Sequence, residues 1–106
     1  MQIDVSDYEN WIGKTQEIED KLEVSPLNRM AATLNEQLRG YNIGDKIPTL
    51  WHWLYFLEPT PQSMLATDGH AKKGEFLPPI PLPRRMWAGS RFSFKKSLKA
   101  GDKVIR

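Results

Sequence analysis

Two adjacent arginines are the residues of this chain best suited to binding a charged ligand. Arg84 and Arg85 follow a segment stiffened by Pro81 and Pro83, and a guanidinium can donate two parallel hydrogen bonds to a phosphate or a carboxylate. His70 lies in a polar, glycine-flanked segment ahead of them and is a further candidate for contacting a phosphate. We therefore expect these three side chains to lie near an anionic ligand.

A second group of candidates is aromatic. Residues 50–57 are all apolar or aromatic except His52, which stands between Trp51 and Trp53. His52 is either a core histidine with a satisfied hydrogen bond, or a polar group in an apolar pocket that acts as an acid, a base or a ligand contact. Trp51, Trp53 and Trp87 can line an apolar wall for a ligand, with packing in the core as the alternative for each.

The composition limits the classes of protein and of site. A chain of 106 residues is one domain at most, or a piece of a larger one. It has no cysteine, which excludes disulfides and thiolate metal sites and is compatible with the cytoplasm. Two histidines without a carboxylate at useful spacing predict no metal site. No signal peptide is expected, and the longest apolar run is too short to cross a bilayer.

The charge is unevenly distributed. Residues 1–70 carry five basic and 11 acidic side chains, whereas residues 71–106 carry ten basic and two acidic ones, within a net charge of +2. A basic C-terminal third can receive the phosphates of nucleic acid, lipid or a nucleotide-bearing ligand. A solvated surface balanced by the acidic N-terminal part is the competing interpretation.

Two helices are predicted in the first 40 residues. Residues 1–23 show an amphipathic helical pattern, opened by a capping box of Ser6 and Glu9. A second helix begins at Ser25 and Pro26 and is expected to stop at Gly40. Its apolar face consists of Leu27, Met30, Ala31, Leu34 and Leu38.

Residues 59–83 are predicted to form one long loop. They contain six of the eight prolines, and a loop of this length in a small domain is usually functional or disordered. The prolines set the path of the chain, and a docking motif for a proline-binding partner is the less favoured interpretation.

Two segments are predicted to be buried strands. The length and aromatic content of residues 50–57 favour a strand over a short buried helix. Residues 86–98 alternate, and Phe92 and Phe94 share the parity of Met86 and Leu98, so we expect both phenylalanines to be buried. A turn at residues 99–102 then leads to a strand beginning at Lys103 that has little to pair against. We therefore expect the natural domain to continue beyond residue 106.

Several of these stretches together resemble the N-terminal region of the MaoC-like dehydratases, in the branch with mesaconyl-CoA hydratases and type 2 hydroxyacyl-thioester dehydratases. The resemblance covers most of residues 25–106. It is carried by residues 50–57, 61–63, 68–70, 76–79 and 82–89, with Phe92-x-Phe94 and Leu98-x-x-Gly101-Asp102.

The resemblance implies an α+β chain with a partial hot-dog fold, an antiparallel sheet packed on helices, truncated at the C-terminus. Residues 1–106 would form a single, incomplete N-terminal hot-dog unit. Family members add or remove water across the double bond of an acyl thioester on coenzyme A or acyl carrier protein, which is a substrate, so no cofactor is expected. The catalytic Asp/His pair of the family lies in a second hot-dog unit and has no counterpart here. This chain is therefore expected to be a non-catalytic or substrate-binding portion.

The resemblance also implies partners, and the residue types described above indicate which side chains would bind the substrate. We expect either a homo-oligomer or a second hot-dog unit as the partner, with no membrane and no nucleic acid. The residues expected to bind the substrate are Arg84, Arg85, His70, Trp51, His52, Trp53 and Trp87. A single-stranded nucleic-acid-binding module and a structural assembly module are the alternatives, because aromatic and basic residues are interleaved near the C-terminus.

Overall fold

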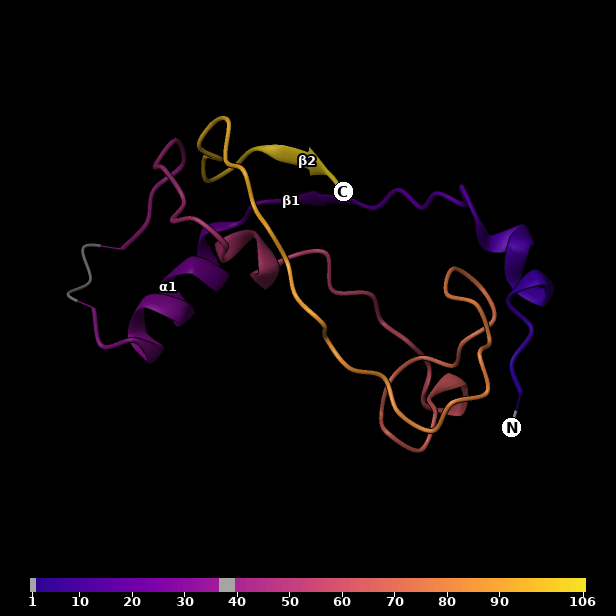
Figure 1. The fold of residues 1–106 in the computed structure, drawn as a ribbon. Coiled ribbons are helices and arrows are strands. Elements are labelled where there is room, and N and C mark those ends of the chain that lie inside the picture. The colour runs from indigo at the N-terminus through magenta and orange to yellow at the C-terminus, as the bar shows by residue number, and fades with distance from the viewer. Residues whose placement is uncertain (1, 37–39) are drawn as a thin grey trace. The chain divides into compact units, whose positions relative to one another are not determined.

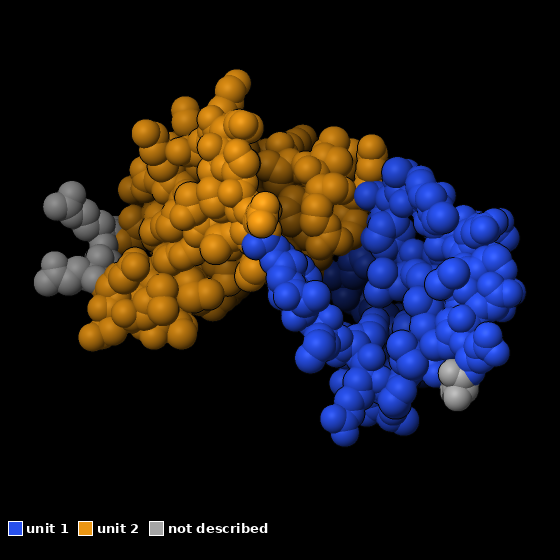
Figure 2. Space-filling view, viewed as in Figure 1, with its two compact units in different colours: residues 1–16, 58–90 blue, residues 17–57, 91–106 orange. Residues whose placement is uncertain are grey.

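The computed structural model describes residues 2–36 and 40–106, and the chain forms two compact units (Figure 2). Unit 1 comprises Met1–Gln16 and Glu58–Ser90, and unit 2 comprises Glu17–Leu57 and Arg91–Arg106. Each unit therefore joins two stretches that are far apart in the sequence.

The described residues contain one α-helix, three 3-10 helices and two short strands, so the α+β class is confirmed (Figure 1). None of the helices in this part of the chain is long and apolar enough to cross a membrane. In chain order the elements are η1 (Val5–Trp11), β1 (Glu19–Lys21), α1 (Val24–Thr33), η2 (Trp51–Leu54), η3 (Gln62–Met64) and β2 (Lys103–Ile105).

The two strands form an antiparallel pair within unit 2. Asp20 of β1 lies opposite Val104 of β2, and Ile18 and Arg106 extend the pairing by two backbone hydrogen bonds of 3.0 and 2.9 Å. The predicted strand at the C-terminus is therefore confirmed. The expectation that it has little to pair against is wrong, because its partner lies in the segment predicted to be the first helix.

The turn predicted at residues 99–102 is also confirmed. Gly101 has a φ of +91°, a left-handed conformation that glycine adopts without steric cost. A Cβ atom at this position would lie 3.0 Å from the side chain of Ile43. Glycine is therefore required here both by the backbone conformation and by the neighbouring side chain.

The prediction of a helix over residues 1–23 is wrong. Only Val5–Trp11 is helical, as a 3-10 helix, and its N-cap is Asp4, whose carboxylate accepts hydrogen bonds from the amide (3.0 Å) and hydroxyl (2.7 Å) of Ser6. Gly13 has a φ of +79° and is followed by extended chain. The helical periodicity is overridden because this segment pairs with β2, and Ile18 and Leu22 donate further backbone hydrogen bonds at either end of β1.

The second predicted helix is confirmed as α1, with different ends. Its N-cap is Glu23 rather than Ser25, and it ends at Thr33 rather than at Gly40. Asn35 adopts a φ of +56°, and the amides of Asn35 and Glu36 donate to the carbonyls of Ala32 and Ala31. This is a Schellman motif, which satisfies the last carbonyls of the helix. Leu38, assigned to the apolar face, lies outside the described residues.

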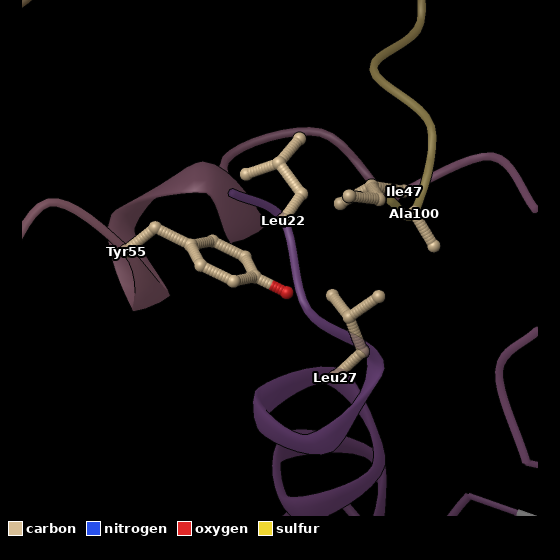
Figure 3. Close-up of a cluster of buried hydrophobic side chains, with 5 residues drawn as sticks. All are labelled: Leu22, Leu27, Ile47, Tyr55 and Ala100. Atoms are coloured by element: carbon tan, nitrogen blue, oxygen red, sulfur yellow. The ribbon is translucent and has the colours of Figure 1, made fainter. Parts of the chain in front are cut away.

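A small hydrophobic core holds unit 2 together. Leu22 and Leu27 are fully buried, and they pack with Ile47, Tyr55 and Ala100 (Figure 3). The Tyr55 hydroxyl donates a hydrogen bond to the carbonyl of residue 23, and burial raises the pKa of this tyrosine. All of the buried hydrophobic residues among those described belong to unit 2.

The prediction of a strand over residues 50–57 is wrong. Residues 51–54 form the short helix η2, flanked by Leu50 with a φ of +72° and Phe56 with a φ of +60°. Left-handed residues at both ends prevent an extended conformation through this segment. A continuous apolar run suits a strand or a buried helix equally, and here tertiary packing of Tyr55 into the core decided the outcome.

The predicted strand over residues 86–98 is also absent from the described structure. Met86 and Trp87 are 90% and 76% exposed, and Phe92 and Phe94 are about half exposed, so the expected burial of the phenylalanines is wrong. The alternating pattern finds no neighbouring strand with which to form a hydrogen-bonded ladder. The long proline-rich loop over residues 59–83 does form, with only η3 as regular structure within it.

The core of unit 2 yields a stability prediction. Replacing Leu27 by alanine should reduce the free energy of unfolding by about 2–5 kcal/mol, because it removes buried methyl groups and leaves a cavity. Leu57→Ala is the matched control: Leu57 belongs to the same unit but is 78% exposed, so its change should remain within about 0.5 kcal/mol. Denaturant unfolding would measure both, and equal effects would contradict the assigned core.

Candidate functional site

The structure divides the expected substrate-binding residues between the two units. His70, Arg84, Arg85 and Trp87 belong to unit 1. Trp51, His52 and Trp53 belong to unit 2 and lie in η2. The two groups therefore form two candidate regions.

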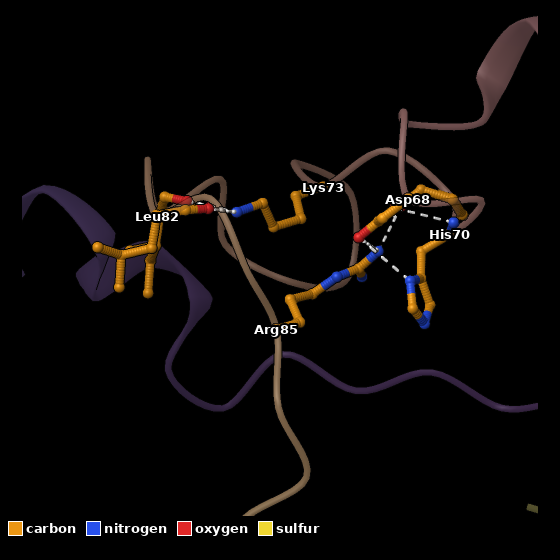
Figure 4. A network of polar contacts seen from close by, with 7 residues as sticks. Asp68, His70, Lys73, Leu82 and Arg85 are labelled. Atoms are coloured by element: carbon orange, nitrogen blue, oxygen red, sulfur yellow. Dashed lines mark hydrogen bonds and ion pairs between the residues drawn. The ribbon is translucent and has the colours of Figure 1, made fainter.

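Asp68 connects two of the predicted residues in unit 1. Its carboxylate lies 3.2 Å from Nδ1 of His70 and 3.8 Å from Nη2 of Arg85 (Figure 4). The amide of His70 also donates to Asp68 over 3.0 Å. Asp68 was not among the predicted site residues. The signal for it was an aspartate before glycine, whose side chain commonly accepts from the amide two residues later.

The electrostatics of this cluster follow from these contacts. The amide of His70 is the main cause that holds the pKa of Asp68 below its usual value, with smaller contributions from the His70 side chain and from Arg85. Partial desolvation opposes this lowering. Asp68 therefore remains a carboxylate at neutral pH and offsets positive charge in the loop.

Basic side chains also connect residues 71–73 of the proline-rich loop with residues 80–85, where the loop ends. Lys73 donates to the carbonyls of Ile80 (2.5 Å) and Leu82 (3.4 Å), and Arg85 donates to the carbonyl of Ala71 (3.3 Å). Figure 4 shows the side chain of Lys73 directed at the backbone near Leu82. Because unit 1 has no buried hydrophobic core among its described residues, these polar contacts are a main constraint on its conformation.

A cavity of about 160 Å³ lies between these two segments of the loop. Its polar lining includes Asp68, Lys73, Arg84 and Arg85. Arg85 and Lys73 are engaged with the chain itself, whereas Arg84 is exposed and has no ion pair with any other described residue. Arg84 is therefore the arginine best placed to contact an anion. Arg85 also has a structural role, because it contacts Asp68 and the carbonyl of Ala71.

The Asp68–His70 contact also has acid–base potential. It engages Nδ1, and the other ring nitrogen of His70 points away from the carboxylate in Figure 4. A carboxylate that holds one imidazole nitrogen leaves the other able to exchange a proton. The side chain of His70 is 64% exposed.

In unit 2 a row of aromatic contacts runs from η2 to the C-terminal segment. The ring of Trp53 lies 6.0 Å from that of His52 and 5.7 Å from that of Phe92, and the rings of Phe92 and Phe94 are nearly parallel at 6.0 Å. Trp51 instead packs against the core and against Tyr41 at 5.8 Å, so its structural interpretation is favoured.

A second cavity, of about 200 Å³, lies at the end of this aromatic row. It was missed in the sequence, where the available signal was two lysines directly after Phe92-x-Phe94. Its lining consists of Ile47, Pro48, Thr49, Leu50, His52, Phe94, Lys95, Lys96, Ser97 and Leu98.

Among all described residues there is no group of three or more histidine, aspartate or glutamate side chains that could hold a metal ion.

Comparison with known proteins places these features in a family context. Residues 50–106 match the model for hydroxyacyl-thioester dehydratase type 2. The chain is also 43% identical over 101 residues to a mesaconyl-C(4)-CoA hydratase from Chloroflexus aurantiacus, an alignment that covers 95% of this chain and 36% of that protein. The chain thus spans about a third of the length of this curated relative.

The Asp68 cluster yields a prediction for the pH dependence of unit 1. Because its pKa is lowered from 3.8 in the folded chain, the carboxylate stabilises the fold above that value, and this stabilisation is lost as the pH falls through the folded pKa. A carboxyl NMR titration should give a midpoint below 3.8.

Two variants test the causes of this lowering. His70→Ala keeps the amide donor, so the midpoint should rise while remaining below 3.8. Arg85→Ala should change it less, because the arginine makes the smaller contribution. A wild-type midpoint at or above 3.8 would contradict the arrangement.

Proposed function

Because the chain belongs to the type 2 hydroxyacyl-thioester dehydratase family, we propose that it forms the N-terminal, ligand-binding part of an acyl-thioester hydratase or dehydratase. The observation that carries this proposal is the match to the family over residues 50–106, together with 43% identity to a hydratase. The expected family relationship is thereby confirmed, and it supports a hydratase-like function.

The reaction requires more than binding. Adding water to an enoyl thioester needs a base to activate the water, an acid for the α-carbon and donors for the charge that develops on the thioester oxygen. In this proposal these groups come from a second hot-dog unit, and the present chain contributes contacts to the substrate. We assign the exposed Asp68–His70 pair to substrate binding and no catalytic step.

The proposed substrate is an acyl thioester of coenzyme A or of acyl carrier protein, with no cofactor. The name of the relative, mesaconyl-C(4)-CoA hydratase, supports the coenzyme A form. Arg84 would contact a phosphate or a carboxylate of this ligand, with His70 and Arg85 beside it. In unit 2, Trp53 and His52 are a separate candidate contact for a ring or an apolar group of a ligand.

We further propose a hot-dog fold completed by additional strands, which β1 and β2 would join. The completing unit is either a second copy of the chain or a second hot-dog unit. Large apolar side chains are exposed among the described residues, Ile105 of β2 and Met86 among them, and their burial against a partner would favour such an association. The cytoplasm is the proposed location.

The ligand contact can be tested with single arginine variants. Arg84→Ala should weaken coenzyme A binding at least about tenfold, since a hydrogen bond to a charged group contributes about 1.5–3 kcal/mol. Arg29→Ala is the control: its side chain lies on α1 and contacts Ser25, so binding should be unchanged. Isothermal titration would measure both affinities. Unchanged coenzyme A affinity and an unchanged hydration rate in the longer enzyme would refute the assignment of Arg84.

One observation favours a second candidate function, single-stranded nucleic-acid binding. Phe92 and Phe94 are 47% and 52% exposed, and Lys95 and Lys96 follow them directly. Exposed aromatic rings beside lysines can stack with bases and neutralise phosphates.

The primary proposal predicts only weak oligonucleotide binding, which should disappear at physiological salt. A fluorescence titration with a single-stranded oligonucleotide at rising salt would measure it, and tight binding that persists would favour the second function. A folded dimer that binds neither coenzyme A nor oligonucleotide would instead indicate an assembly module.

A further inference from the structure

The cavity at the end of the aromatic row combines an aromatic ring with positive charge. Phe94 and His52 contribute rings to its lining, Lys95 and Lys96 contribute ammonium groups, and Ser97 contributes a hydroxyl. All of these residues belong to unit 2. The cavity is therefore defined within one compact unit.

Its rings are held in place by neighbours. Phe94 lies nearly parallel to Phe92, with an angle of 13° between the ring planes, and His52 packs edge-on against Trp53 with an angle of 72°. A ring fixed in this way loses little side-chain freedom when a flat ligand group stacks on it, which favours binding.

Its charges have no partner within the described structure. Neither Lys95 nor Lys96 forms an ion pair with any residue in 2–36 or 40–106, and both are exposed. Lys73 and Arg85 of unit 1, in contrast, are engaged with backbone carbonyls. The lysines beside Phe94 are thus available to an anionic ligand.

The size of the cavity limits what enters it. Sites for drug-sized ligands have volumes of about 300–1,000 Å³, whereas this cavity measures about 200 Å³. It can therefore hold one end of a large ligand, such as a single heterocyclic base, while attached phosphates remain at the exposed lysines.

We propose that this cavity binds the phosphorylated purine nucleotide end of the ligand, with the base against Phe94 and His52 and the phosphates at Lys95 and Lys96. The choice of a nucleotide that carries a thioester rests on the proposed function, because the stacking surface and the charges alone would accept other purine nucleotides. This site lies outside the set of residues expected from the sequence, apart from His52.

Adenosine 3′,5′-bisphosphate, coenzyme A, ADP and pantetheine are the probes that test this assignment, each titrated against the chain by calorimetry. The bisphosphate and coenzyme A should bind, and pantetheine, which lacks the nucleotide, should bind at least about tenfold more weakly. ADP binding equal to that of the bisphosphate would also support the site, as one that accepts purine nucleotides in general. Failure of the bisphosphate to bind would overturn the proposal.

Variants of the residues that line the cavity test whether the bisphosphate binds there. Lys95→Ala/Lys96→Ala should weaken bisphosphate binding at least about tenfold, and Phe94→Leu at least about fivefold, through loss of stacking. The matched control is Lys99→Ala/Lys103→Ala, which removes the same charge from the same unit outside the cavity lining and should retain affinity. Equal losses in the two double variants would overturn the site. Circular dichroism would verify that each variant is folded.

The outcomes separate this site from the proposed function. Lysine-dependent bisphosphate binding without thioester hydration by the longer enzyme would support the site and count against the function. If the longer enzyme hydrates the thioester and bisphosphate affinity is unchanged in Lys95→Ala/Lys96→Ala, the function is supported and the site is overturned. Single-stranded oligonucleotide binding tighter than that of any mononucleotide would also overturn it, in favour of a nucleic-acid surface.

Discussion

Burial of Leu22 and Leu27 is the interaction on which the rest of unit 2 depends. These two side chains are fully buried, and they bring Ile47, Tyr55 and Ala100 together from segments widely separated in the sequence. Apolar burial contributes about 25 cal/mol per Å², so in a chain with so few buried residues each contact carries a large share of the stability. The packing of Tyr55 also sets the position of η2, and the packing of Ala100 sets the start of the turn that leads into β2.

Unit 1 is organised by a different constraint. Its described residues include no buried hydrophobic side chain, and its loop is held by polar contacts around Asp68, by Lys73 and by Arg85. Polar contacts at an exposed surface contribute less than core packing and are weakened by salt and by water. Such a loop can adjust to a ligand at modest cost, which suits a segment proposed to bind an acyl thioester.

The candidate site was only partly predictable from residue types. Arginine after a proline-rich segment was a sound signal for an anion contact, yet Arg85 is engaged with Asp68 and with a backbone carbonyl, and Arg84 remains exposed. The cavity beside Phe94 was missed because alternation predicted that this ring would be buried. A period-2 pattern implies burial only where a neighbouring strand and a second layer exist, and the described structure supplies neither beside residues 86–98.

By itself the sequence determined the family, the α+β class, helix α1, the long proline-rich loop and the turn before β2. The helix, the loop and the turn depend on local chemistry: helical spacing, proline geometry and the conformational freedom of Gly101. Only the tertiary structure decided that residues 19–21 form a strand, that residues 51–54 form a short helix and that Asp68 joins His70 to Arg85. These outcomes depend on partners distant in sequence, because backbone pairing with β2 and burial of Tyr55 outweigh weak local preferences.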